Sequence, residues 1–156
     1  MKVCHLILNH ISTHTKAIVV ADIFGQSADI DEIMKIAKRY NLKVISDTAQ
    51  APGANYKNKL AGTLADIGGF SLNYHKHIHT GEGGIVVTNN DYYADKIRLI
   101  RNHAESAAEG SGATNYSNLI GYNFRLGEIE SAIGIEQLKK LDHLVQIKRK
   151  NVEQLN

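Results

Sequence analysis

The hydrophobic pattern of the first third of the chain predicts a strand, a helix and a second strand. Residues 17–21 form an apolar, β-branched run closed by Gly25, which is typical of a buried strand. A helix is expected from about residue 29, because four apolar residues recur there at the spacing of one helical face: Ile30, Ile33, Met34 and Ala37. Residues 42–45 form the second apolar run. Strand, helix and strand within about thirty residues indicate a right-handed βαβ unit and therefore the opening of a parallel sheet.

Two further strands are predicted downstream, at residues 66–72 and 84–88. Residues 89–91, Asn-Asn-Asp, are suited to begin a helix that would run to about Arg101. Residues 107–118 are rich in Gly, Ser, Ala and Asn, which predicts a surface loop. These elements predict the α/β class, with a mostly parallel sheet flanked by helices.

From about Leu126 the pattern predicts one long helix that continues to the end of the sequence. Its apolar residues recur as an amphipathic stripe formed by Leu138, Leu141, Val145, Val152 and Leu155. The polar side of this helix is predicted to carry Lys139, Lys140, Lys148 and Lys150.

Composition narrows the class of protein. Hydrophobic residues make up 43% of the 156 residues and charged residues 22%, as in soluble globular domains. The net charge of +2 is spread along the chain and does not indicate nucleic-acid binding. The single cysteine favours a reducing compartment, and the apolar patch at residues 6–8 is too short for a signal peptide or a membrane span. We therefore expect a soluble, cytoplasmic protein.

Three polar residues follow predicted strands, where parallel sheets place their functional side chains. Asp47 comes after the second strand, Ser71 ends the third, and Lys76 lies just beyond it. An acid, a hydroxyl and an amine at one edge are compatible with a small-molecule site. Taken alone, these residue types more often indicate a turn-forming aspartate and a solvated loop lysine.

Two other motifs suggest different chemistry. His75, His77 and His79 alternate, so that an extended strand would place all three on one face, an arrangement typical of metal ligands. No acidic or cysteine partner lies nearby in the sequence, which favours a histidine-rich polar loop instead. Residues 80–84, Thr-Gly-Glu-Gly-Gly, resemble a phosphate loop but precede a strand, whereas phosphate loops follow a strand and open a helix.

Several segments of the sequence resemble the DegT/DnrJ/EryC1/StrS family of sugar-nucleotide aminotransferases, and they occur in the order found in that family. These enzymes have fold type I and use pyridoxal phosphate (PLP). The resemblance begins at Thr15. It is carried by residues 46–51, 69–72 leading to Lys76, 80–84, 101–103, 121–125 and 132–138. It implies transfer of an amino group from glutamate or glutamine to a nucleotide-linked keto sugar, in a homodimer that shares its active sites.

The resemblance also implies the role of each residue at the site. Lys76 would form the Schiff base with the cofactor and carry protons, while Asp47 would pair with the pyridine nitrogen. Ala49 would lie against the ring face, and Gln50 would hydrogen-bond the phenolic oxygen. Ser71 would bind the phosphate, and Asn123 would reach the phosphate of the neighbouring subunit.

The sequence departs from the family at two positions next to the implied site. Ser46 stands where the family usually has Glu, and Thr48 stands where Ala is common. A dehydratase branch of the family, which removes the sugar 3-hydroxyl, has His in place of the lysine. Here His75 and His77 flank Lys76, but the spacing from Ser71 and from Gly81 places the lysine in that position, which favours transamination.

The resemblance covers only the central part of the family's large domain. No match to the family's N-terminal phosphate-binding segment precedes Thr15, and the sequence stops within the helix that leads to the small domain. Residues 1–125 are therefore predicted to form an incomplete cofactor-binding domain, and residues 126–156 a connecting helix. We expect these 156 residues alone to bind PLP weakly and to be an inactive remnant without turnover.

Overall fold

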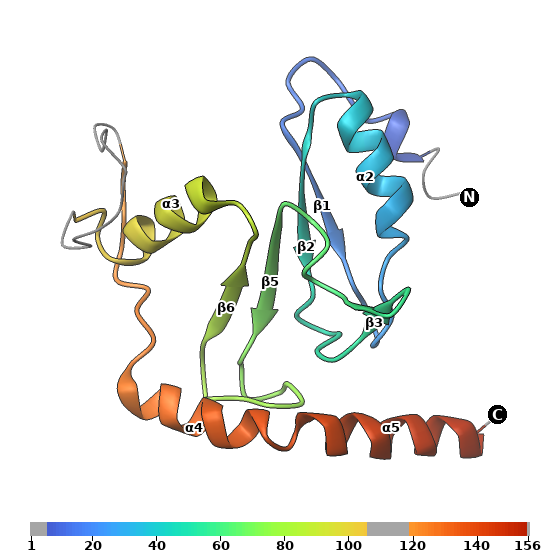
Figure 1. Ribbon diagram of the computed structural model, residues 1–156, viewed down its shortest axis with the longest axis vertical. Helices are drawn as coiled ribbons and strands as arrows, with labels where there is room; N and C mark the ends of the chain where they lie inside the picture. The colour runs from blue at the N-terminus through green and yellow to red at the C-terminus, as the bar shows by residue number, and fades with distance from the viewer. Residues whose placement is uncertain (1–5, 106–118, 156) are drawn as a thin grey trace.

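The computed structural model of the protein describes residues 6–105 and 119–155. Its main sheet has the order β1-β2-β5-β6 (Figure 1). The strands span Ala17–Ala21, Lys43–Asp47, Ile67–Ser71 and Gly84–Val87, so the four predicted strands are confirmed. The prediction that residues 17–21 are buried was wrong, because β1 is the edge strand of the sheet and none of its residues is buried. The first three strands run parallel, and β6 pairs antiparallel with β5, which makes the sheet mostly parallel as expected.

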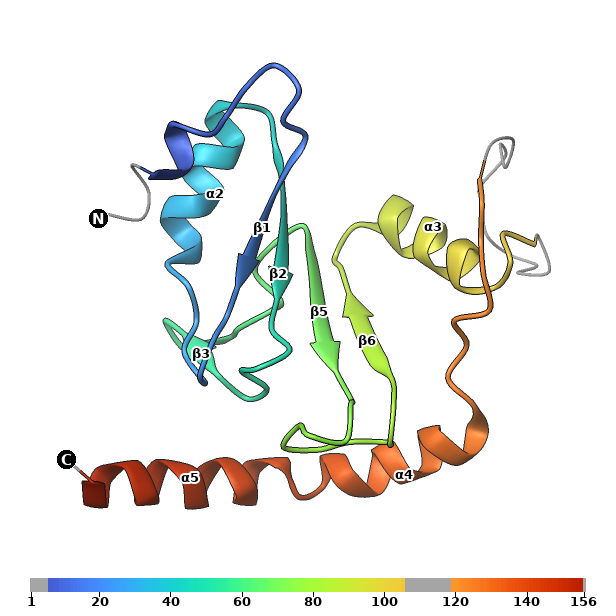
Figure 2. The ribbon, with the colours of Figure 1, turned by 180° about the vertical axis from the view of Figure 1, so that it is seen from behind.

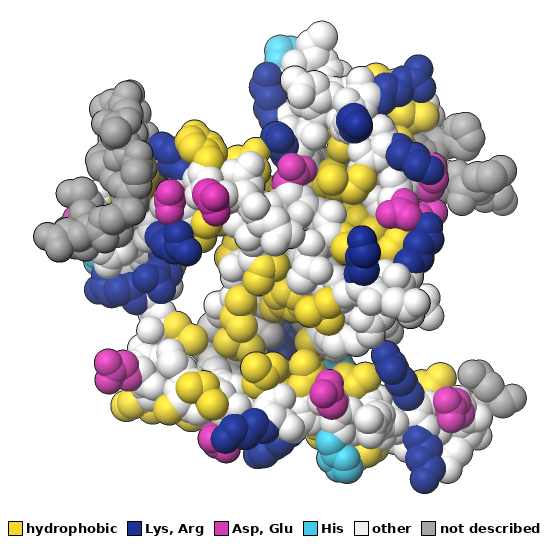
Figure 3. All heavy atoms as spheres, in the orientation of Figure 1, with side chains coloured by type: hydrophobic (Ala, Val, Ile, Leu, Met, Phe, Trp, Pro, Cys, Tyr) yellow, Lys and Arg dark blue, Asp and Glu magenta, His cyan; other side chains and the backbone are white. Residues whose placement is uncertain are grey.

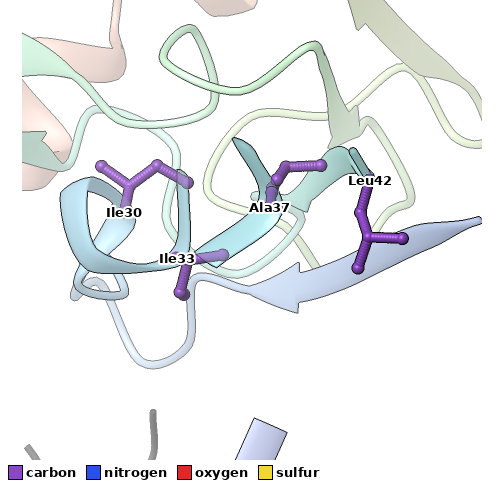
Figure 4. Close-up of a cluster of buried hydrophobic side chains, with 5 residues drawn as sticks. Ile30, Ile33, Ala37 and Leu42 are labelled. Atoms are coloured by element: carbon purple, nitrogen blue, oxygen red, sulfur yellow. The ribbon is translucent and has the colours of Figure 1, made fainter. Parts of the chain in front are cut away.

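Helix α2, Ile30–Arg39, connects β1 to β2 and covers one face of this edge of the sheet. Its apolar face, together with Leu42 and Val44, forms the largest buried cluster, part of which is shown in Figure 4. Asp31 and Glu32 in the first turn and Lys38 and Arg39 in the last turn complement the helix dipole. The predicted βαβ unit is therefore present.

The alternation of side chains along β2 determines which residues face the core. Val44 and Ser46 are buried, and so is Thr48 just after the strand, on the side covered by α2. Asp47 and Ala49 consequently lie on the opposite face of the sheet, because successive side chains in a strand point to opposite sides. Along this segment, the alternate residues 44, 46 and 48 therefore pack in the core, whereas the candidate site residues Asp47 and Ala49 face the other side of the sheet.

A short hairpin of β3, Asn55–Tyr56, and β4, Lys59–Leu60, leads into β5. The chain after this hairpin passes so close to β5 that a Cβ added to Gly68 would overlap the carbonyl oxygen of Gly62. We expect Gly68→Ala to lower the free energy of unfolding by about 1–3 kcal/mol, as overpacking does. Gly69→Ala is the matched control, because its added Cβ would come no closer than 3.9 Å to Ser46 O. Equal urea midpoints for the two variants would contradict this reading of the close approach.

Helix α3, Asp91–Arg101, follows β6 as predicted. The side chain of Asn90 caps it by accepting a hydrogen bond from the amide of Tyr93 at 3.1 Å. The surface loop predicted at residues 107–118 lies outside the described residues.

The predicted long C-terminal helix is divided into α4, Glu128–Leu138, and α5, Leu141–Leu155, which pass along the lower end of the sheet in Figures 1 and 2. The amide of Lys140 bonds to the carbonyl of Gln137, a tightened turn that ends α4 without glycine or proline. The two helices pack on different segments: Gly134 of α4 approaches Thr80, and Val145 of α5 approaches Gly53. The prediction of one uninterrupted helix was wrong, and the domain boundary at residue 125 stays a prediction.

The apolar stripe predicted for this region is only partly covered. Leu141 and Val145 are half-buried, whereas Leu138, Val152 and Leu155 are exposed. Figure 3 shows hydrophobic side chains gathered between the sheet and the C-terminal helices. Within the described ranges, 6–105 and 119–155, no helix has the length and hydropathy needed to span a membrane.

Candidate active site

The parallel strands bring Asp47 and Ser71 to the same edge and the same face of the sheet. Asp47 pairs in register with Gly69, and Ser71 lies two residues further along β5. Both residues line a cavity of about 970 Å³ together with Ala49. Asp47 Oδ1 accepts a hydrogen bond from the amide of Ala49 at 3.1 Å, which orients the carboxylate. The Ser71 hydroxyl accepts a bond from the amide of Asn73 at 3.2 Å.

Lys76 lies in a turn beyond β5 and lines a second cavity, of about 920 Å³. Its amide donates to the carbonyl of Asn73 at 2.9 Å, and that bond closes the turn. Gln50 and Ala49 line the same cavity from the segment that follows β2. The strand ends thus place Lys76 and Gln50 together, although they are far apart in the sequence.

Ala49 lines both cavities, so the space around Lys76 adjoins the space around Asp47 and Ser71 at this residue. A small side chain at this point leaves room for a flat group between the two cavities. Asn123 lies elsewhere: it is exposed, forms an isolated bridge with Asn102, and lines neither cavity. Five of the six candidate residues therefore line one or both of these two cavities, and the sixth lines neither.

Asp22, a buried carboxylate that is not among the sequence-predicted site residues, forms hydrogen bonds to the segment that carries Asp47 and Ala49. Asp22 follows β1 and is only 3% exposed. Its Oδ2 accepts hydrogen bonds from the Ser46 hydroxyl at 2.8 Å and the Thr48 hydroxyl at 2.7 Å. Its Oδ1 accepts a bond from the amide of Ala28 at 2.9 Å, and its own amide donates to the carbonyl of Asp47 at 2.8 Å.

This network explains the two departures from the family pattern. The Ser46 and Thr48 side chains point into the core, where a hydroxyl needs a partner, and Asp22 satisfies both. Since residues 46 and 48 are held on the inner face, Asp47 and Ala49 are held on the outer one. The rule that identified Asp47, a polar residue directly after a strand, would also have identified Asp22.

The three alternating histidines do not lie on an extended strand. Residues 74–78 form turns and bends, and His75 and His77 line the Lys76 cavity whereas His79 does not. The Nδ1 atom of His79 is buried without a hydrogen-bond partner in the described part of the chain. No three His, Cys, Asp or Glu side chains come together as metal ligands would within residues 6–105 and 119–155.

His77 has an altered electrostatic environment. Burial lowers its pKa below the ordinary value of 6.5, and the positive charges of Lys148 and Lys76 lower the pKa further. At neutral pH the His77 ring is therefore predominantly neutral, although the cavity around it is cationic. This effect shows that Lys148 of α5 and Lys76 act on the same space.

Residues 80–84 serve as a turn that leads into β6 and not as a helix-opening phosphate loop. Gly81 and Gly83 have φ angles of 88° and 149°, in the region that favours glycine. The Thr80 hydroxyl donates to the carbonyl of Glu82 at 2.7 Å, and the amide of Leu72 donates to the carbonyl of Gly83 at 2.9 Å. These bonds close the loop that carries Lys76.

Comparison with known proteins shows which family the chain is similar to. The model of the DegT/DnrJ/EryC1/StrS aminotransferase family matches residues 3–156. A GDP-perosamine synthase from Caulobacter vibrioides is 40% identical over 140 residues, covering 89% of this chain and 37% of that protein. A UDP-4-amino-4,6-dideoxy-N-acetyl-beta-L-altrosamine transaminase from Campylobacter jejuni is 43% identical over 132 residues, covering 85% of this chain and 35% of that protein.

Solved structures share the fold. The E. coli GDP-4-keto-6-deoxy-D-mannose-3-dehydratase, solved with bound hydrated PLP, superimposes with a TM-score of 0.82 at 32% identity. The match covers 96% of this chain and 42% of the dehydratase chain. The sequence therefore spans about two fifths of the length of the relatives it matches, and the sheet and helices described above correspond to part of a fold type I enzyme.

Proposed function

The chain belongs to the DegT/DnrJ/EryC1/StrS aminotransferase family, and on this basis we propose that it acts in a cytoplasmic PLP-dependent aminotransferase. The proposed reaction transfers an amino group from glutamate or glutamine to a nucleotide-linked keto sugar. Two relatives are a GDP-perosamine synthase and a UDP-linked sugar transaminase by name, which supports an amino transfer on a nucleotide sugar. The structural observation that carries the proposal is the position of Ala49 between the Lys76 cavity and the Asp47–Ser71 cavity.

The residues present fit the cofactor. An amine in one cavity, a carboxylate and a hydroxyl in the other, and a small residue between them suit a flat ring with a reactive carbon, a basic nitrogen and a phosphate. When bound, PLP supplies the carbonyl carbon that takes up the amino group and the ring that withdraws electrons. The open face of the sheet at Asp47 and Ala49 leaves space for this ring.

Each candidate site residue that lines the two cavities then has a specific role. The Lys76 amine is the attachment point of the cofactor, and it moves a proton at the α-carbon of the amino donor and at the keto carbon of the sugar. The Asp47 carboxylate, oriented by the amide of Ala49, keeps the pyridine nitrogen protonated. Gln50 would hydrogen-bond the phenolic oxygen, and the Ser71 hydroxyl would bind the phosphate.

Asn123 has a role only in an assembly. Because this exposed residue lies outside both cavities, we propose that it reaches the cofactor phosphate of the neighbouring subunit in a homodimer. Its neighbours Tyr122 and Phe124 are large and exposed, with 59% and 64% of their surface accessible, and exposed aromatic residues favour a protein interface. This observation supports the shared active site.

A dehydratase function is the second candidate. The E. coli 3-dehydratase has the same fold, and His75 and His77 lie in the same cavity as Lys76. An imidazole next to the reacting carbon could take the place of the amine in proton transfer. The amine of Lys76 between these two histidines favours amino transfer, because only an amine can hold the cofactor covalently.

The decisive experiment offers PLP, glutamate or glutamine, and GDP- and UDP-linked 4-keto-6-deoxy sugars to the purified whole protein to which this chain belongs. Mass spectrometry of the sugar product is expected to show an oxygen replaced by nitrogen, with release of the keto acid. A sugar that loses its 3-hydroxyl without gaining nitrogen would establish the dehydratase instead. Unchanged sugars with every donor would contradict both candidates.

A further inference from the structure

The charged side chains that line the cavity around Lys76 are mostly basic. It is formed by residues 24–26, residues 49–54, the Lys76 turn and the last half of α5. Its charged side chains are three basic ones, Lys76, Lys148 and Arg149, and one acidic one, Glu153. Helix α5 therefore brings two positive charges into the space where the reacting amine lies.

The sequence pattern had assigned Lys148 to the solvent side of an amphipathic helix. In the structure, Lys148 and Arg149 line the cavity, whereas the next residue, Lys150, does not. Neither Lys148 nor Arg149 takes part in the ion pairs formed among residues 6–105 and 119–155. Lys139, by contrast, is held by Glu136 at 2.6 Å.

Lys148 lies close enough to the reacting loop to interact with it electrostatically. The charges of Lys148 and Lys76 both act on His77, whose pKa is lowered by burial and by these two cations. Like charges around a partly desolvated group repel one another, and this repulsion is relieved when an anion binds between them. The arrangement is thus suited to an anionic ligand.

The chemistry of the proposed substrates indicates which anion it is. In a nucleotide-linked sugar, the diphosphate is attached to the anomeric carbon, only a few bonds from the carbon that receives nitrogen. A sugar whose keto carbon lies at Lys76 must therefore place its diphosphate within the same cavity or at its mouth. Arginine binds phosphate oxygens in bidentate fashion, and lysine binds them as a point charge.

We propose that Lys148 and Arg149 of α5 form a subsite for the diphosphate of the nucleotide-linked sugar, next to Lys76. The inference rests on the proposed function and deepens it, because it names the residues that recognise the nucleotide part of the substrate. The subsite is separate from the cofactor phosphate, which is assigned to Ser71 in the adjoining cavity.

The test measures binding of UDP and GDP by calorimetry to the purified whole protein to which this chain belongs and to two variants of it. The Lys148→Gln/Arg149→Gln double variant is expected to bind the better of the two nucleotides at least about 10-fold more weakly, since hydrogen bonds to charged groups are the strong ones. Lys150→Gln, a neighbour on the same helix that does not line the cavity, is expected to stay within about 2-fold, as exposed charges do. Circular dichroism should show the same helix content for all three proteins.

Two further measurements separate this inference from the proposed function. PLP affinity, measured by absorbance, should be unchanged in the double variant, and the KM for the keto sugar nucleotide should rise more than kcat falls. A double variant that loses PLP affinity but keeps nucleotide affinity would overturn the subsite and leave the aminotransferase intact. Nucleotide binding unchanged by the double substitution would overturn it as well, and wild-type protein that binds neither nucleotide and aminates no sugar would overturn both proposals.

Discussion

Lys76→Ala is expected to abolish covalent attachment of PLP and to lower kcat by about 10³-fold or more, since the variant loses both a nucleophile and a proton carrier. Lys76 lines the cavity that adjoins Asp47 and Ser71 at Ala49, which is where the amine must lie to reach the cofactor. Borohydride reduction of the wild-type protein with PLP, followed by peptide mass spectrometry, should show the label on Lys76. The same treatment should leave the Lys76→Ala variant unlabelled.

Lys35→Ala is a suitable control for this experiment. Lys35 is an exposed lysine of α2 that pairs with Glu32, and it lines neither of the two site cavities. Its loss should change neither labelling nor kcat. Specific labelling of any other lysine in the wild-type protein, or an active Lys76→Ala variant, would contradict the assignment of Lys76.

Asp22→Ala is expected to lower the free energy of unfolding by about 3 kcal/mol, because buried donors that lose their acceptor carry a desolvation penalty. Three donors depend on this carboxylate: the Ser46 and Thr48 hydroxyls and the amide of Ala28. The two hydroxyls lie 3.2 Å apart and can partly compensate by bonding to each other, which limits the loss. Urea unfolding followed by circular dichroism measures the change.

The hydrogen bonds of Asp22 also predict that the losses of stability in single and double variants are not additive. Ser46→Ala in the Asp22→Ala background should cost less than it does in the wild-type protein, because its partner is already absent. Glu32→Gln, at an exposed ion pair of α2, should change stability by less than about 1 kcal/mol. Additive losses for Asp22 and Ser46 would mean that the carboxylate and the hydroxyl do not stabilise each other.

Local pattern was sufficient for most of the secondary structure. The strand at residues 17–21 follows from an apolar, β-branched run, helix α2 from apolar residues at helical spacing, and helix α3 from a capping residue, Asn90. The break between α4 and α5 was not predictable, because residues 139–140 include neither glycine nor proline. That break accompanies the packing of Gly134 on Thr80 and of Val145 on Gly53, contacts between residues far apart in the chain.

The sequence by itself determined the residue types of the candidate site and their order: Asp47, Ser71 and Lys76 follow strands, and a parallel sheet brings strand ends to one edge. Only the tertiary structure decided what surrounds them. It placed Asp22 beneath Ser46 and Thr48, and it brought Lys148 and Arg149 of α5 into the Lys76 cavity. The physical reason is that periodicity records which face a side chain occupies, whereas hydrogen-bond partners and neighbouring charges depend on how distant segments pack.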